Sequence, residues 1–159
     1  MISRTRFCSR FKASDGWRIL RGEINFPARA RQINNFSELL FGKITPTDVD
    51  GEIEYHDKAW VRIEVKYHGK ELPFGQKLCI ERFVSDVHKS GKSALAIVVE
   101  HEVDDPNQSV PVADCYVREV YHSTQKLWVK PKTRTTAKEM ITSFFAAVDG
   151  KIKVGEKTE

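Results

Sequence analysis

The sequence predicts one α/β domain with a central mixed sheet flanked by helices, and three observations carry this prediction. Residues 51–67 alternate between apolar and charged side chains in two runs, as the strands of an antiparallel hairpin do. Residues 76–90 place apolar side chains at helical spacing. Residues 93–100 are an almost unbroken apolar run, typical of a strand buried on both faces. A strand, a helix and a second strand in this order form a right-handed crossover, which makes the two strands parallel.

The hairpin is the part of the sequence around which the rest is arranged. Its second strand, residues 60–67, alternates so that Glu64 and Lys66 fall on the charged face, because successive strand residues point to opposite sides. Its first strand, residues 51–55, alternates in the same way and is joined to the second by a short polar turn. This pairing brings Asp50, at the start of the first strand, close to Glu64 on the second.

The segment before the hairpin divides into an arm and a short helix. Residues 1–33 are rich in arginine, with aromatic residues between the basic ones. This pattern suits contact with a nucleic-acid backbone together with base stacking, and it equally suits an arm that packs its rings on the core. Asn34 or Asn35 caps a short helix that runs to Phe41 and ends at Gly42. We expect the apolar side of this helix to cover the sheet.

The segment after the hairpin supplies the remaining elements. Thr136, with Glu139 three residues later, forms a capping box that opens a last helix ending at Gly150. The elements predicted before it are a loop at 68–75, the helix at 76–90, the strand at 93–100, an acidic loop at 103–109 and strands at 112–121 and 126–132. The predicted boundaries are a basic arm at 1–33, the α/β domain at 34–150 and a flexible tail at 151–159.

Charge is distributed unevenly along the chain. The formal net charge of +4 is the balance of +6 over residues 1–31, −6 over 32–125 and +4 over 126–159. An acidic centre between basic ends suits a metal-dependent enzyme that acts on a polyanion, because carboxylates hold the ion while Lys and Arg hold phosphates. Basic ends that are merely solvated are the alternative interpretation. The predicted nucleic-acid contacts are Arg4, Arg6, Arg10, Lys70, Lys130, Lys132 and Arg134.

Composition excludes several other classes of protein. A chain with 40% hydrophobic and 30% charged residues is that of a soluble globular protein, and no apolar run is long enough to cross a bilayer. Three distant cysteines without a Cys-x-x-Cys pair predict neither a zinc site nor a disulfide framework. We expect Cys79 and Cys115 to be buried as small hydrophobes. The basic N-terminus lacks the apolar segment of a secretory signal, so we expect a cytoplasmic protein without a membrane partner.

The charged face of the hairpin carries the most specific chemical signal. Asp50 and Glu64 converge at one edge of the sheet, where two carboxylates supply the hard oxygen ligands of Mg²⁺ or Mn²⁺. A metal ion there activates a water nucleophile and stabilises charge on a phosphate. Lys66 beside them holds or deprotonates the attacking water, or neutralises the developing charge. The alternative for these residues alone is an ordinary solvated strand face, on which Glu-x-Lys is common.

The order of these features resembles the PD-(D/E)XK nuclease superfamily, whose signature is an aspartate followed on the next strand by Glu-x-Lys. The resemblance covers residues 34–101 and implies a restriction endonuclease-like core. It also implies that Asp50 and Glu64 bind the metal together with the backbone carbonyl of Val65. Lys66 is then the catalytic lysine.

The same resemblance suggests roles for three further residues. Gln76 matches a glutamine that some branches of the superfamily carry at the start of the next helix, where it assists Lys66 or the substrate. Glu38 matches an acidic residue that some branches place on the first helix. The usual Pro-Asp pair is absent, so Asp48 stays an alternative to Asp50 as the metal ligand. We prefer Asp50 because it directly precedes the turn into the strand.

The residues and the resemblance together predict a deoxyribonuclease that uses Mg²⁺ or Mn²⁺ to hydrolyse phosphodiester bonds. Its partner is then a nucleic acid, with DNA preferred over RNA, and a homodimer is open because many members of the superfamily act as dimers. The alternative is a non-catalytic nucleic-acid-binding or assembly module on the same fold, followed by a structural protein with a solvated acidic face. Strand form, sequence specificity and internal or terminal cutting stay open.

Overall fold

The computed structural model describes residue 32, residues 35–36 and 38–39, and residues 41–150. The chain divides into two compact units, Met1–Pro46 and Thr47–Glu159. The predicted arm at 1–33, with Arg4, Arg6 and Arg10, lies outside the described residues except for residue 32, and the predicted tail at 151–159 lies outside them entirely. None of the helices that are described is both long and apolar enough to cross a membrane.

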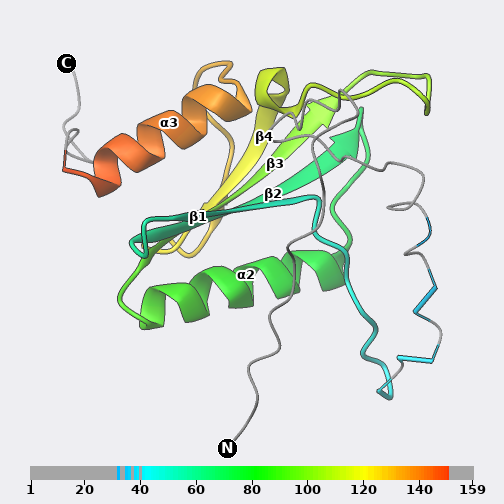
Figure 1. Cartoon of the computed structure of the whole chain (residues 1–159), viewed down its shortest axis with the longest axis horizontal. Coiled ribbons are helices and arrows are strands. Elements are labelled where there is room, and N and C mark those ends of the chain that lie inside the picture. The colour runs from blue at the N-terminus through cyan, green and yellow to red at the C-terminus, as the bar shows by residue number, and fades with distance from the viewer. Residues whose placement is uncertain (1–31, 33–34, 37, 40, 151–159) are drawn as a thin grey trace, which may run out of the picture. The chain divides into compact units, whose positions relative to one another are not determined.

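The second unit has an α/β fold with a five-stranded mixed sheet (Figure 1). The sheet order is β1-β2-β3-β4-β5; β2 and β3 are parallel, and the other neighbouring pairs are antiparallel. The predicted mixed sheet, with its antiparallel hairpin and parallel crossover strand, is therefore confirmed. The elements are β1 (Gly51–Tyr55), β2 (Ala59–Tyr67), α2 (Phe74–Lys89), β3 (Ser93–His101), a 3₁₀ turn (Val112–Asp114), β4 (Tyr116–His122), β5 (Trp128–Val129) and α3 (Ala137–Val148).

Local sequence explains how the hairpin and the last helix form. The β1–β2 turn places His56 and Asp57 at φ angles of 50° and 58°, a left-handed conformation in which Asp and His are enriched. The predicted capping box of α3 is present, since Thr136 Oγ1 accepts from the Glu139 N–H and the Glu139 carboxylate accepts from the Thr136 N–H at 2.8 Å. Both features satisfy backbone groups at the points where the chain changes direction.

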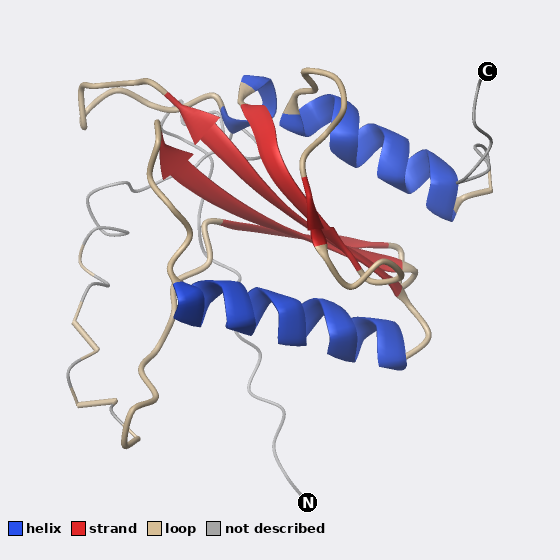
Figure 2. Ribbon diagram, turned by 180° about the vertical axis from the view of Figure 1, so that it is seen from behind, coloured by secondary structure: helices blue, strands red, loops and turns tan. Residues whose placement is uncertain are grey.

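The two helices cover opposite faces of the sheet, as Figures 1 and 2 show. The face under α3 is apolar along its length, and Val61, Ile97 and Val99 are each at most 1% exposed there. The face under α2 is apolar around Ala94, Ala96 and Tyr121. Successive residues of a strand point to opposite faces, so one packs under α3 and the next under α2. The same strands therefore contribute to two apolar clusters.

Two predicted elements are wrong in the structure. The strand predicted at 112–121 begins only at Tyr116, because β3 ends opposite that residue and the preceding segment forms the 3₁₀ turn instead. The short helix predicted to end at Gly42 is absent from the described residues of its segment. The Leu39 N–H donates to the Phe36 carbonyl in a turn, and Phe41 pairs with Ile44 around Gly42, whose φ of +64° suits a tight turn. Cys115 is buried as predicted, whereas Cys79 is exposed on α2.

Candidate active site

Four of the predicted site residues come from three neighbouring elements of the second unit. Glu64 and Lys66 lie on β2, on the face that α2 covers, because they alternate with the apolar residues under α3. Gln76 lies in the first turn of α2. Asp50 directly precedes β1, and the register that pairs Gly51 with Ile63 brings it to the same part of β2.

Direct hydrogen bonds connect these residues. Lys66 Nζ donates to Glu64 Oε1 at 2.7 Å and to Gln76 Oε1 at 3.0 Å. Gln76 Nε2 in turn donates to Asp48 Oδ1 at 3.4 Å. Asp50 Oδ2 accepts the backbone N–H of Val65 at 2.7 Å, which fixes its carboxylate between Glu64 and Lys66 along the strand. The structure thus brings together the five residues Asp48, Asp50, Glu64, Lys66 and Gln76.

Glu64 occupies the most unusual environment in this group. It is 5% exposed, and its burial is the main reason that its pKa is raised above the ordinary glutamate value. The negative charges of Asp50 and, to a smaller extent, Asp48 raise the pKa further, while the hydrogen bond and charge of Lys66 lower it. The net effect is upward, so Lys66 compensates only part of the cost of holding a carboxylate here. A cation placed between these carboxylates would favour their ionised forms.

The two carboxylates could hold Mg²⁺ or Mn²⁺ if water supplies the other ligands. Among the described residues no three His, Cys, Asp or Glu side chains form a group that could enclose an ion. Mg²⁺ keeps several of its waters and is commonly bound through one or two carboxylates. The charges of Asp50 and Glu64 are close enough to affect each other, which is the feature such an ion requires.

The remaining predicted residues come from other segments of the chain. Glu38 belongs to the first unit, whereas the other candidate site residues that are described belong to the second. Lys70 lies in the loop after β2, and its backbone carbonyl accepts from Arg118 at 2.7 Å. Three exposed basic residues follow β5: Lys130, Lys132 and Arg134.

Sequence reasoning missed a second polar pair on the same face. Glu100 of β3 is directly opposite Lys66 in the register, and its carboxylate accepts from Arg118 Nη1 of β4 at 2.8 Å. The side chain of Arg118 is 14% exposed. Glu100 ends the apolar run of β3. A charged residue at the end of a buried strand was the one sign in the sequence of a polar contact there. Its pairing with Arg118 depends on a bulge opposite Val98 and Val99, which no sequence period reveals.

Comparison of the chain with known protein families, with curated proteins and with solved structures finds no match.

Proposed function

We propose that the protein is a metal-dependent DNA nuclease with a restriction endonuclease-like core, which hydrolyses phosphodiester bonds with Mg²⁺ or Mn²⁺. One observation carries the proposal: a buried carboxylate of raised pKa, Glu64, lies within hydrogen-bond distance of Lys66 and under the influence of Asp50. Buried ionisable groups with perturbed pKa values are costly, and they concentrate at functional sites.

In this proposal Asp50 and Glu64 hold the metal, with the backbone carbonyl of Val65 as a further oxygen ligand. The bound ion would supply Lewis-acid stabilisation of phosphate charge and a water of lowered pKa. Lys66 Nζ is aimed by its two hydrogen bonds, to Glu64 at 2.7 Å and to Gln76 at 3.0 Å. From that position it orients the attacking water or neutralises charge on the phosphate. Gln76 acts as a positioning residue, because it bonds to both Lys66 and Asp48.

The basic residues outside the site would hold the nucleic-acid backbone. Lys70, Lys130 and Lys132 are exposed, and the predicted arm residues would add to them. Arg134 is exposed as well, but its guanidinium lies over the Tyr116 ring. Binding through phosphates releases condensed counterions, so the affinity for DNA should fall steeply as salt increases.

The test is cleavage of plasmid and labelled oligonucleotides by Glu64→Ala and Lys66→Ala variants, with Mn²⁺ and with EDTA. We expect EDTA to abolish cleavage, and each substitution to reduce it at least 100-fold, as removal of a group that stabilises the transition state does (about 2.7 kcal/mol or more). Asp86→Asn and Lys89→Ala are matched controls. These residues form an acid–lysine pair that is 70% and 71% exposed at the other end of α2.

Two outcomes would count against the proposal. Cleavage that persists in both site variants, or in EDTA, would contradict this mechanism. DNA binding without metal-dependent cleavage of any substrate form would instead favour the non-catalytic nucleic-acid-binding module.

A further inference from the structure

A second polar site lies beside the candidate active site, at the end of the sheet where β2 and β3 finish and β4 begins. Lys66 of β2 is directly opposite Glu100 of β3, and Glu100 is directly opposite Tyr116 of β4. Residues directly opposite one another in adjacent strands point to the same face. Since neighbouring strands are about 4.8 Å apart, Tyr116 is roughly 10 Å from Lys66 across the sheet. That distance spans about three stacked bases of one nucleic-acid strand.

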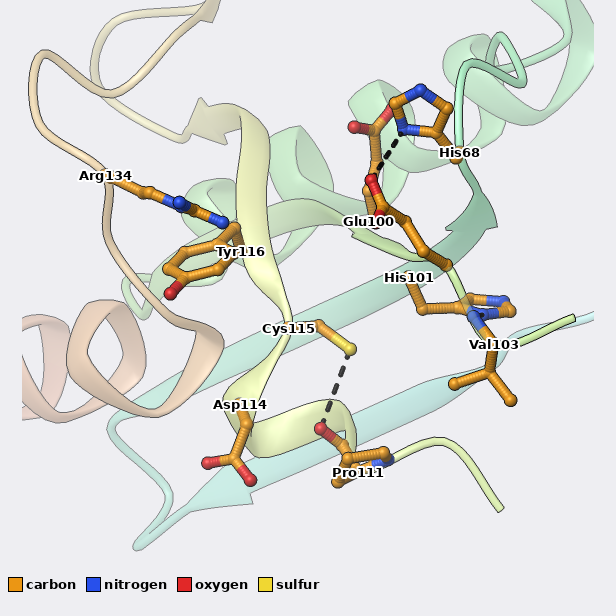
Figure 3. A pocket seen from close by; sticks show the side chains of 10 residues that line it. His68, Glu100, His101, Val103, Pro111, Asp114, Cys115, Tyr116 and Arg134 are labelled. Carbon is orange, nitrogen blue, oxygen red and sulfur yellow. Dashed lines mark hydrogen bonds and ion pairs between the residues drawn. The ribbon is translucent and has the colours of Figure 1, made fainter. Parts of the chain in front are cut away.

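A cavity of about 440 Å³ opens at this end of the sheet (Figure 3). Its volume falls in the range of pockets that hold small organic groups, ~300–1,000 Å³. Its lining includes an aromatic ring, an arginine, a histidine and three carboxylates: Tyr116, Arg134, His68, Glu100, Glu102 and Asp114.

Tyr116 and Arg134 form a flat platform on one side of this cavity. The Tyr116 residue is 41% exposed, and the guanidinium carbon of Arg134 lies 3.7 Å from the ring centroid. Backbone hydrogen bonds hold Arg134 there, because the Val117 N–H donates to the Thr135 carbonyl at 2.9 Å and the segment runs beside β4. Unpaired bases stack on aromatic rings and on guanidinium planes, and each stack contributes about 1–3 kcal/mol.

The charges around the platform suit a base better than a phosphate. The carboxylates of Glu100, Glu102 and Asp114 line the same cavity and would repel a phosphate. Carboxylates do accept hydrogen bonds from the amino groups of bases, as Asp and Glu do from cytosine. A base could therefore lie in the cavity while the strand continues towards the basic residues outside it.

Arg118 binds Glu100, one of the residues that line this cavity. Its Nη1 donates both to Glu100 Oε1 at 2.8 Å and to the backbone carbonyl of Lys70 at 2.7 Å. One largely buried guanidinium therefore joins β3, β4 and the loop after β2. Because Glu100 lines the cavity and lies directly opposite Lys66, these bonds help to hold the cavity beside the strand that carries Lys66.

We propose that this cavity binds an unpaired nucleobase of the substrate strand, a few nucleotides from the phosphodiester bond that is cut. This inference rests on the proposed nuclease function and specifies its substrate: a nucleic acid with a single-stranded stretch at the cleavage point. A base inside a continuous duplex is paired and stacked, and bringing it to the platform would cost several kcal/mol.

The test is fluorescence anisotropy with the full-length chain in EDTA, using one labelled oligonucleotide as a single strand and as a duplex. Wild type should bind the single strand more tightly. Tyr116→Ala should weaken single-strand binding about 5- to 150-fold, the loss of one stacked base, and leave duplex binding nearly unchanged. Tyr116→Phe should retain most of the affinity.

The outcomes separate this proposal from the nuclease assignment. Equal losses for both strand forms in Tyr116→Ala, or an equal loss in Tyr116→Phe, would overturn the base-binding cavity. Metal-dependent cleavage with the same rate on single strand and duplex, in wild type and in Tyr116→Ala, would overturn it while leaving the nuclease intact. Selective loss of single-strand binding in Tyr116→Ala, in a chain that shows no cleavage, would support the cavity and contradict the nuclease.

Discussion

The two faces of the sheet are made by the same strands, yet they are built from different chemistry. Under α3 the strands present an apolar surface that includes Val61, Ile97 and Val99. Under α2 the surface is apolar near Ala94 and Ala96 but becomes charged towards the start of the helix. The charged residues there include Glu64, Lys66, Glu100 and Arg118. In the apolar part, Arg62 lies opposite Ala96, packs on Phe83 of α2 and pairs with Glu52 at 2.6 Å.

This difference separates stability from function. Apolar burial stabilises the fold wherever it occurs, so the α3 face needs no further explanation. A buried ion pair recovers its desolvation cost only when its geometry is very good, and hydrophobic residues of similar volume often stabilise a protein as well or better. The charged end of the α2 face is therefore expected to have been retained for binding or catalysis. The predictions below test this division.

The largest effect on stability is expected on the α3 face. Ile97→Ala removes a side chain that is 1% exposed and leaves a cavity between the sheet and α3. We expect the free energy of unfolding to fall by about 2–5 kcal/mol, measured by urea denaturation. Leu127→Ala is the control, because Leu127 is 52% exposed and its loss should change stability by about 0.5 kcal/mol or less. A loss below about 1 kcal/mol for Ile97→Ala would contradict the assignment of this face as the main core.

A smaller effect is expected from the ion pair on the α2 face. Lys66→Met leaves Glu64 buried without its hydrogen-bonding partner, and we expect a loss of about 1–3 kcal/mol in urea denaturation. The double variant Glu64→Gln/Lys66→Met should recover much of this loss, because neither charge remains, and it should stay inactive in cleavage. A double variant less stable than Lys66→Met would show that the pair stabilises the fold and would weaken the division between the faces.

The smallest effect is expected from pH. The pKa of Glu64 is raised from its ordinary value of 4.5, chiefly by burial. The folded chain therefore holds this proton more tightly than the unfolded chain, so the contribution of Glu64 to stability is full below the ordinary value and is lost as pH rises through the raised one. In EDTA, wild type should lose stability relative to Glu64→Gln across that window. Mn²⁺ should oppose the loss, because the ion binds the ionised carboxylate. If the free energy of unfolding changed with pH in the same way for wild type and Glu64→Gln, the raised pKa of Glu64 would be contradicted.

Local patterns in the sequence predicted most of the fold. Alternation placed Glu64 and Lys66 on one face of a strand, and the unbroken apolar run identified β3 as its buried parallel neighbour. The capping box located the start of α3 at Thr136. These predictions succeeded because each depends on residues that are close together in the sequence. The strand predicted at 112–121 failed at its start, because an extended segment becomes a strand only where a partner is present.

The candidate site was predicted in part for the same reason. The hairpin, whose short turn sets its register, predicted that Asp50 would lie near β2 and that Glu64 and Lys66 would share one face. The chemistry of these residues stays a prediction. A role for Gln76 beside Lys66 was suggested only by resemblance to a family, and in the structure Lys66 Nζ donates to Gln76 Oε1. Glu100 and Arg118 were missed entirely, because their pairing joins two strands separated by a long loop.

The sequence by itself determined which side chains share a face of each strand, since that follows from a period of two along the backbone. The tertiary structure alone decided which faces meet and in what register. It placed Tyr116 two strands from Lys66 and Arg134 over the Tyr116 ring. It also brought Arg118 of β4 within hydrogen-bond distance of Glu100 and of the loop after β2. The register between distant strands depends on loop closure, a bulge and the packing of two helices, all acting together. No local pattern in the sequence predicts their combined effect.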